Sequence, residues 1–354
     1  MNYSRRRQEV QGRLEDEGTS AFLVSGPHNV LYLSGFTGGD SWLFLAGERA
    51  VLLTDFRYRE QAESEAPDLE VAIRNNETLT DLVARLLPDG ARLAFEAVHL
   101  SYAGYGRLAG KVNADRLHKT EGRVEELRAV KSAEEIERIR RAVVVAEESF
   151  QETRTHIRPG MTEKELADEL VYRMRRCGAE EESFPVIVAA GERASLPHAQ
   201  STDRPVRCGE GLLVDWGATV DSYNSDLTRV LFVGNIPGLL RTIYRVVLAA
   251  QQEAYEACRS GALLGEVDEA ARGFITEAGY GEAFGHALGH GVGLEVHERP
   301  TLRHGADEPA CVGMVHTIEP GIYLPGVGGI RLEDDVLITK TGCEVLTTLP
   351  VDLT

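Results

Sequence analysis

The chain has 354 residues and a formal net charge of −18, and 43% of its residues are hydrophobic. A chain of this length predicts two domains, and its apolar content is sufficient for a substantial core. The acidity argues against nucleic acid or an anionic membrane as a partner, since both are polyanions. No apolar run approaches the ~18 residues of a membrane-spanning helix, so we expect no transmembrane segment.

The start of the chain, MNYSRRRQEVQGRLEDEG, is charged and has no apolar stretch of the kind found in secretory signal peptides. Five cysteines are scattered along the chain, and no CxxC pair occurs among them: Cys177, Cys208, Cys258, Cys311 and Cys343. This spacing predicts neither a zinc ribbon nor a disulfide framework. A reducing cytoplasm is the compartment that fits both observations.

The first ~125 residues alternate between strand-like and helix-like runs. Strands are expected over 21–36, 41–56, 69–73 and 92–98, and helices over 4–18, 56–66 and 77–87. Such alternation predicts a small α/β domain. A long helical stretch follows Ser132, with Glu135 three residues later in the pattern of a capping box. We therefore expect two domains, 1–124 and 125–354.

The rest of the chain contains two similar halves. At one constant offset, Gly160 matches Gly261, Glu165 matches Glu266, and Gly178 matches Gly279. Each half continues into an apolar strand and a hairpin, which sets Asp215 opposite Glu319 and Asp226 opposite Glu333 or its neighbours. Two such halves facing each other would each present a pair of acids from adjacent strands.

Most acidic residues are explained by a solvated surface, but the four acids of the two halves need another explanation. Alone, Asp215 after GLLV would be a turn residue, and a salt bridge with Arg331 would account for Glu333 inside an apolar-alternating strand. A buried acid is costly unless it is paired, hydrogen-bonded or bound to metal. With His290, the four acids supply one imidazole and four carboxylates, which suit Mn²⁺, Co²⁺ or Zn²⁺. Their charges balance two divalent ions, and the glycines beside His290 let the backbone approach closely.

Four segments carry a resemblance to a known family: LLVDWGATVDSYNSDLTR, GHGVGLEVHERP, MVHTIEPGIY and GIRLEDDVLIT. They are similar to the motifs of the pita-bread metallopeptidases, which include aminopeptidase P, prolidase and methionine aminopeptidase. The segments YLSGFTGGD and LLTDFRY resemble the creatinase-like N-terminal domain of the proline-specific branch, which methionine aminopeptidases usually lack. The resemblance covers nearly the whole chain. It implies an α/β two-domain fold, with a small creatinase-like α/β domain before a pseudo-symmetric pita-bread α+β catalytic domain.

The resemblance also implies a metal centre with two divalent ions per chain. Asp215 and Asp226 would hold the first ion, and His290 and Glu319 would hold the second. Asp226 and Glu333 would bridge the two ions. Creatinase, a relative that is not a peptidase, does without these ligands, whereas this chain has all five.

Five further residues match positions near the metals. His198 in SLPHAQ and His297 in LEVHERP would donate hydrogen bonds to the scissile carbonyl and the oxyanion, unless they are ordinary histidines satisfied by backbone. Arg331 would orient the two bridging acids. His286 would play a similar part or be a helix-end histidine, and Phe184 would line a proline pocket or pack in the core.

The implied reaction is hydrolysis of a Xaa-Pro bond at the N-terminal end of a peptide, with Glu319 as general base and proton shuttle. Proline has no amide N–H and a fixed φ, so a pocket shaped for its ring would explain a dedicated enzyme. We favour a Xaa-Pro dipeptidase (prolidase). The alternative is an aminopeptidase P that acts on longer peptides. A creatinase-like or non-catalytic relative, which would use the pocket for binding or another hydrolysis, fits five intact ligands less well.

Short proline-containing peptides are thus the expected partners, and we expect a cytoplasmic homodimer. A dipeptide places a free carboxylate beside the proline, which a dipeptidase must hold with a cationic or multiply donating clamp. The candidates are Arg331, Arg299, His198 and His297. The loop TGGDSW in the N-terminal domain could close over the site of its own or a partner subunit and exclude long peptides.

Overall fold

The computed structural model describes residues 1–15 and 18–351, and the chain divides into two compact units, Met1–Arg128 and Ala129–Thr354. The sequence places the domain boundary slightly earlier, after residue 124. Among the described residues, no helix is both long and apolar enough to cross a membrane. Each unit has a hydrophobic core of its own.

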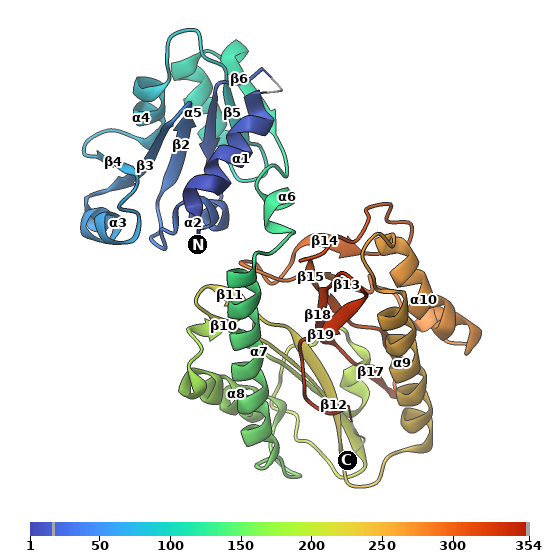
Figure 1. Cartoon of the computed structure of the whole chain (residues 1–354). Helices are drawn as coiled ribbons and strands as arrows, with labels where there is room; N and C mark the ends of the chain where they lie inside the picture. The colour runs from blue at the N-terminus through green and yellow to red at the C-terminus, as the bar shows by residue number, and fades with distance from the viewer. Residues whose placement is uncertain (16–17, 352–354) are drawn as a thin grey trace. The chain divides into compact units, whose positions relative to one another are not determined.

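The first unit is built on a six-stranded mixed sheet with helices packed against it (Figure 1). Its elements are α1 (Tyr3–Glu15), β1 (Ala21–Val24), α2 (Pro27–Ser34), β2 (Trp42–Ala46), β3 (Arg49–Asp55), η1 (Phe56–Tyr58), α3 (Arg59–Glu65), β4 (Glu70–Arg74), α4 (Leu79–Leu86), β5 (Leu93–Glu96), α5 (Tyr102–Val112), η2 (Ala114–Arg116), β6 (Leu117–Thr120) and α6 (Glu125–Arg128). The strand order is β4-β3-β2-β1-β5-β6, in which β2 runs antiparallel to both neighbours and the other pairs are parallel. This is the α/β domain that the alternating pattern predicts.

Several parts of this unit differ from the sequence prediction. Strand β6 was not predicted, and the stretch expected as a strand over 41–56 forms two strands, β2 and β3. The strand expected over 21–36 is wrong beyond Val24, because Pro27 begins a helix at a position where no N–H is needed and Gly35 ends it with φ 79°. An apolar run alone does not distinguish a buried strand from a buried helix. The helix α5 was not predicted, and Ser101 begins it by accepting a hydrogen bond from the N–H of Gly104. The predicted helix over 4–18 is present as α1, and its residues 16 and 17 lie outside the described residues.

The second unit contains two similar halves, each with two long helices and an antiparallel sheet. The first half has α7 (Ala133–Arg154), α8 (Glu163–Cys177), β7 (Glu181–Glu182), β8 (Ile187–Ala190), η3 (Gly191–Ser195), β9 (Glu210–Trp216), β10 (Ala218–Val220), β11 (Tyr223–Asn224) and β12 (Leu227–Val233). The second half has α9 (Gly238–Ala257), α10 (Leu264–Glu277), η4 (Gly281–Ala283), β13 (Gly289–Gly291), β14 (Glu298–Leu302), β15 (Val315–Ile318), β16 (Gly321–Leu324), β17 (Gly328–Arg331), β18 (Asp334–Ile338) and β19 (Cys343–Val345).

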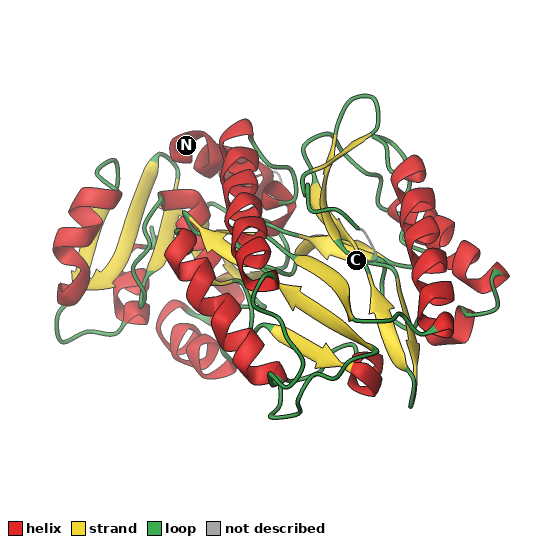
Figure 2. Ribbon diagram, turned by 90° about the horizontal axis from the view of Figure 1, so that it is seen from below, coloured by secondary structure: helices red, strands yellow, loops and turns green. Residues whose placement is uncertain are grey.

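The helices of the two halves enclose the strands. Figure 1 shows α7 and α8 on one side of the strands and α9 and α10 on the other, and Figure 2 shows the same strands between helices from below. The larger sheets have the orders β12-β9-β8 and β14-β13-β15-β18-β19. The arrangement matches the pseudo-symmetric catalytic domain that the sequence predicts.

Local sequence signals account for the helix ends. Ser132 and Glu135 form the predicted capping box at the start of α7, so that prediction is confirmed. The same device begins α8, where Thr162 and Glu165 cap each other. The matched glycines share left-handed backbone, with φ 94° at Gly160, 86° at Gly261, 112° at Gly178 and 86° at Gly279. Each half therefore uses glycine at the same two points, before its second helix and after it.

Strand pairing brings acids from the two halves together. Asp215 is the penultimate residue of β9 and pairs with Thr228 in β12. The carbonyl of Thr228 in turn accepts a hydrogen bond of 3.2 Å from the N–H of Glu333, and this isolated bridge joins the two larger sheets. Glu319 follows the last residue of β15, which pairs with β18 directly after Glu333. The carboxylates therefore gather where the sheets of the two halves meet.

Candidate active site and metal centre

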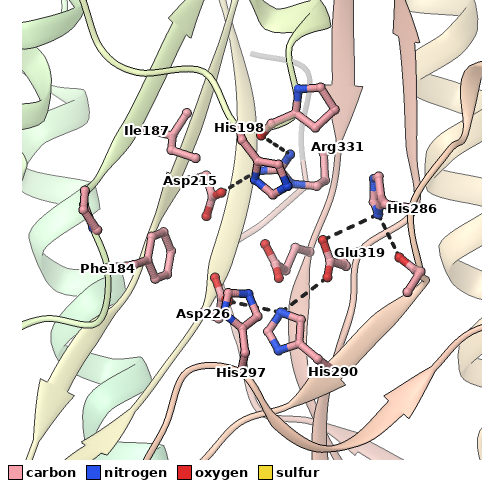
Figure 3. Close-up of a pocket in the computed structure, with 14 residues that line it drawn as sticks. Phe184, Ile187, His198, Asp215, Asp226, His286, His290, His297, Glu319 and Arg331 are labelled. Atoms are coloured by element: carbon pink, nitrogen blue, oxygen red, sulfur yellow. Dashed lines mark hydrogen bonds and ion pairs between the residues drawn. The ribbon is translucent and has the colours of Figure 1, made fainter. Parts of the chain in front are cut away.

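The second unit contains a cavity of about 390 Å³ at this junction (Figure 3). Its lining residues are Phe184, Pro185, Ile187, Pro197, His198, Asp215, Asp226, His286, Ala287, His290, His297, Glu319, Arg331 and Glu333. The ten site residues named from the sequence are all among them. The sequence analysis did not identify Pro185, Ile187, Pro197 or Ala287, although Pro185 and Pro197 stand next to residues that it named.

The four acids and His290 lie close enough together to share metal ions. In His290, Nε2 is 3.5 Å from Glu319 Oε1 and 3.6 Å from Asp226 Oδ2. Ligand atoms of three sets lie within 4.8 Å of one another: Asp215, Asp226 and Glu333; His290, Glu319 and Glu333; and Asp226, His290 and His297. Asp226, Glu333 and His290 each belong to two of these sets, and of the three only the carboxylates of Asp226 and Glu333 have two oxygens that could contact two adjacent ions.

Burial makes this arrangement unfavourable for the charged carboxylates. Burial raises the pKa of Asp226 and of Glu319 well above their usual values, and repulsion by Glu333 is the next largest cause. Burial, followed in importance by repulsion from the Asp215 carboxylate, raises the pKa of Glu333 to about 8. Burial also lowers the pKa of His290 to about 3, with a further contribution from His297, so its imidazole is neutral and free to act as a ligand. Such a cluster requires positive charge nearby to keep its acids ionised.

The residues present fit a divalent metal centre. In the described part of the chain, Asp215 Oδ1 is buried without a hydrogen-bond partner, which is expensive unless the oxygen binds a cation. The guanidinium of Arg331 pairs with the other oxygen of Asp215, but one arginine does not balance four acids. Carboxylate oxygens and one imidazole nitrogen are donors that suit Mn²⁺, Co²⁺ or Zn²⁺.

Arg331 contacts a different acid from the two that the sequence analysis expected. The sequence analysis has it orient Glu333 and Asp226, whereas its Nη2 donates to Asp215 and its Nε donates to Thr228 Oγ1 at 3.0 Å. Thr228 Oγ1 donates to Glu333 Oε2 at 2.6 Å, so Arg331 reaches Glu333 only through this hydroxyl. The salt bridge considered between Arg331 and Glu333 is replaced by the pair with Asp215, because the neighbouring strand β9 presents the closer carboxylate.

Tyr323 is a site residue that the sequence analysis missed. Its hydroxyl lies 2.9 Å from His286 Nε2 and accepts a hydrogen bond of 3.0 Å from Arg331 Nη1. His286 Nδ1 lies 2.7 Å from the carbonyl of Ala287, to which it donates, and burial lowers the pKa of His286 to about 4. Tyr323 thus joins His286 and Arg331 into one hydrogen-bonded group. Tyr323 comes directly after EPGI, so this motif was the signal in the sequence that could have identified it.

The other histidines lie nearer to solvent than the acids do. His198 and His297 are exposed, His290 is half-buried and Asp226 is buried. The rings of His290 and His297 have centroids 4.2 Å apart, with His297 toward the open side. Figure 3 shows His198 and His297 on two sides of the carboxylates, with Phe184 beside them. A molecule entering the cavity would meet these two imidazoles and the phenyl ring first.

Glycines let the strands that carry the ligands approach each other. A Cβ on Gly289, next to His290, would lie 2.1 Å from the carbonyl oxygen of Thr317. A Cβ on Gly217, two residues after Asp215, would lie 1.9 Å from the carbonyl oxygen of Ser225. Backbone atoms occupy both spaces, so only glycine fits.

Comparisons with known proteins give the same assignment for most of the chain. The model of metallopeptidase family M24 matches residues 137–340, and that of the Creatinase/Prolidase N-terminal domain matches residues 6–130. The uncharacterized peptidase YqhT of Bacillus subtilis is 37% identical over 95% of this chain and 96% of its own length. The Xaa-Pro dipeptidase of Pyrococcus furiosus is 36% identical over 94% of this chain and 95% of its own length.

Solved structures agree with the fold. The Xaa-Pro dipeptidase from Bacillus anthracis superposes with a TM-score of 0.96 at 37% identity and covers 99% of both chains. The X-Pro aminopeptidase from Thermotoga maritima MSB8 has a TM-score of 0.89 at 39% identity, over 96% of this chain and 99% of its own. The resemblance read from the sequence motifs is therefore confirmed. The chain belongs to metallopeptidase family M24 and joins a Creatinase/Prolidase N-terminal domain to a pita-bread catalytic domain.

Proposed function

We propose that this chain is a Xaa-Pro peptidase with two divalent ions per chain, and that it prefers dipeptides. The observation that carries the proposal is the convergence of three buried acids, the half-buried Glu319 and His290 beneath two exposed histidines, beside an apolar wall. A metal-dependent peptidase needs both parts, one to activate water and the other to hold the peptide. The names of the relatives from Pyrococcus furiosus and Bacillus anthracis support the same substrate class.

In this proposal, Asp215 and Asp226 hold one ion, His290 and Glu319 hold the other, and Asp226 and Glu333 bridge them. Asp226 and Glu333 each lie in two ligand-distance sets and, unlike His290, which does so too, have two carboxylate oxygens to offer, which supports the bridging roles. When bound, the ions would supply an activated water and polarise the scissile carbonyl. Mn²⁺, Co²⁺ and Zn²⁺ are the candidate ions.

Glu319 is the proposed proton carrier. Its Oε1 accepts from Thr317 Oγ1 at 3.4 Å, and its Oε2 lies 4.0 Å from His286 Nδ1, so among the described residues no hydrogen bond occupies Oε2 and its lone pairs are available to accept a proton. Oε2 would take a proton from the attacking water and deliver it to the proline nitrogen as the peptide bond breaks. The proline nitrogen needs this proton because it leaves as an amine.

His198 and His297 are proposed to bind the substrate. Each would donate an N–H to the scissile carbonyl or to the negative oxygen that develops on it. Their exposure at the rim of the cavity suits contact with a bound peptide better than burial among the acids would. Phe184, with Pro185 and Ile187, would hold the proline ring against the apolar wall.

The proposed preference for dipeptides depends on a clamp for the free carboxylate of the proline. Of the four candidates, Arg299 is exposed, donates to Glu308 at 3.1 Å and is not among the residues that line the cavity. Arg331 is committed to Asp215. His198 and His297 therefore remain as the donors best placed for a carboxylate at the mouth of the cavity.

Three substrates with the same scissile bond test this clamp: Xaa-Pro, its C-terminal amide and Xaa-Pro-Xaa, each with added Mn²⁺. A charge-assisted hydrogen bond contributes ~1.5–3 kcal/mol, and ~1.36 kcal/mol is tenfold in rate. We therefore expect kcat/KM for Xaa-Pro to exceed that for the amide by about 10- to 100-fold. The amide keeps the ring and the scissile bond but removes the charge, and the tripeptide adds bulk.

The second candidate is an aminopeptidase P, which would leave this side open for a continuing chain. The similarity to the X-Pro aminopeptidase from Thermotoga maritima favours it. Equal kcat/KM values for all three substrates would establish this alternative and leave the metal chemistry unchanged. If none of the three substrates is cleaved by the metal-loaded protein, the Xaa-Pro specificity itself is wrong.

A further inference from the structure

Two cysteines that are far apart in the sequence meet at the end of helix α9. Cys258 directly follows α9, and its N–H donates to the carbonyl of Tyr255 at 3.2 Å. Cys343 begins β19, and its thiol donates to the same carbonyl oxygen at 3.4 Å. The thiols of Cys258 and Cys343 are also close enough for each to shift the pKa of the other. One backbone oxygen therefore holds both cysteines side by side within the second unit.

The two thiols differ in access and in acidity. Cys258 is 1% exposed, whereas Cys343 is half-buried and can be reached from solvent. The interaction with Cys258 lowers the pKa of Cys343, whereas the interaction with Cys343, followed by burial, raises the pKa of Cys258. An accessible cysteine of lowered pKa beside a second thiol is the arrangement in which oxidation ends in a disulfide.

His316 provides a place for the proton of Cys258. Its Nδ1 lies 3.0 Å from the carbonyl of Thr317, which can only accept, so Nδ1 carries the ring proton. Its Nε2 is then an acceptor, and this atom lies 3.6 Å from Cys258 Sγ. His316 is fully buried, so the imidazole has no solvent contact and faces the thiol directly.

We propose that Cys343 and Cys258 are a redox-sensitive pair that forms a reversible disulfide when the protein meets a hydroperoxide. The Cys343 thiolate attacks the peroxide, the O–O bond breaks, and a sulfenic acid forms with release of water or an alcohol. Cys258 Sγ then attacks Cys343 Sγ, the S–O bond breaks, and the departing hydroxide takes the proton of Cys258, through His316 Nε2, to leave as water. Two thiols lose two electrons in total, and the peroxide gains them.

The disulfide would hold in place the end of helix α9, which contacts the chain next to the candidate metal site. The Tyr255 hydroxyl donates to Asp334 Oδ2 at 2.6 Å, and Gln251 of the same helix donates to this oxygen at 3.0 Å. Asp334 directly follows Glu333 in the chain. A covalent bond between the end of α9 and β19 would hold this helix end against the sheet and constrain the unfolded chain. The oxidised form should therefore be the more stable one.

The test treats the native protein, without denaturant, with hydrogen peroxide at a few equivalents. We expect titratable thiols to fall from the five of the reduced chain to about three, and peptide mapping to recover a peptide that links Cys258 to Cys343. Tm should rise by about 5–10 °C, and dithiothreitol should reverse all three changes. None of these readouts depends on peptidase activity, so the test is independent of the proposed function.

The control variants separate this pair from the other cysteines. Cys208→Ser with Cys311→Ser removes the two exposed thiols, and this variant should still form the linked peptide and gain Tm. Cys343→Ser should abolish both effects. Because Cys258→Ser alters the core, Cys258→Ala serves as a second variant at that position and should also abolish them. Recovery of Cys343 only as sulfinic acid, or of a linked peptide only after unfolding, would overturn the proposal.

Discussion

At the residue scale, His290 and His297 lie next to each other but are expected to do different work. His290 Nε2 faces two buried acids at 3.5 and 3.6 Å, whereas His297 is exposed at the rim. We predict that His297→Ala lowers turnover by ~10²–10³-fold, as loss of an oxyanion donor does, while the metal content stays near normal. His290→Ala should instead lower the occupancy of one ion. Elemental analysis and kcat, measured on the same preparations, check both statements.

His297 could also bind metal in place of His290. Ligand atoms of Asp226, His290 and His297 lie within 4.8 Å of one another, so His297 is close enough to bind metal itself. If His297→Ala loses metal and His290→Ala keeps it, the two roles have been exchanged. Metal content is the deciding measurement, because both variants are expected to be slow.

Glu333 and Asp226 should be the most sensitive ligands. Each would touch both ions, so Glu333→Ala or Asp226→Ala would remove two bonds and leave neighbouring cations to repel each other. We predict loss of both ions and a greater fall in metal affinity than the ~10–100-fold typical of a residue that only orients a ligand. Thr228→Val is the matched control, since Thr228 Oγ1 donates to Glu333 but Thr228 is not one of the proposed metal ligands. Equal metal affinities for Thr228→Val and Glu333→Ala would contradict the bridging role.

At the element scale, strand β13 carries His290, and the loop that connects β13 to β14 carries His297. Buried side chains anchor this loop. The carboxylate of Glu298 accepts a hydrogen bond of 3.3 Å from the N–H of Glu295 and fills the space above Gly293. Lys131 Nζ lies 2.9 Å from Glu298 Oε1, and both side chains are buried. Lys131 precedes helix α7, so a residue from the start of the second unit neutralises the acid that shapes this loop.

This ion pair predicts a strong and non-additive effect on stability. Lys131→Met should lower the free energy of unfolding by ~3–5 kcal/mol, because it leaves the Glu298 carboxylate buried without its cation. The double variant Lys131→Met with Glu298→Gln should recover part of that loss, since the amide carries no charge. Urea unfolding of the native chain, both single variants and the double variant gives the coupling energy. Additive losses would mean that the pair does not act as a unit.

At the scale of the whole molecule, a net charge of −18 and four clustered acids make the fold sensitive to divalent cations. An ion that binds only the folded state stabilises it by ~2.7 kcal/mol at one hundred times its Kd. We predict that Mn²⁺ raises Tm by about 5–10 °C relative to protein treated with chelator. Calorimetry with K⁺ at equal ionic strength is the control for screening. An unchanged Tm with Mn²⁺ would argue against a metal site that is coupled to folding.

Much of the local structure could be predicted from short signals. The capping box of Ser132 and Glu135 and the α/β alternation of the first unit follow from local patterns, and the two halves of the second unit follow from a repeat at a constant offset along the chain. The helix over 27–34 was missed because an apolar run reads equally well as a strand, and the proline at its start was not weighed. Motif resemblance named ten residues that line one cavity, since the order and spacing of ligands are preserved in the chain.

The sequence by itself determined which side chains were available for chemistry, namely four acids, four histidines and the glycines beside them. Only the tertiary structure decided which partners they have. Arg331 pairs with Asp215, Thr228 supports Glu333, and Cys258 meets Cys343. These contacts join residues from different strands and helices, and periodicity along a chain carries no information about which strands will be neighbours. Burial, and with it the charge that each acid can hold, is likewise a property of the packed molecule.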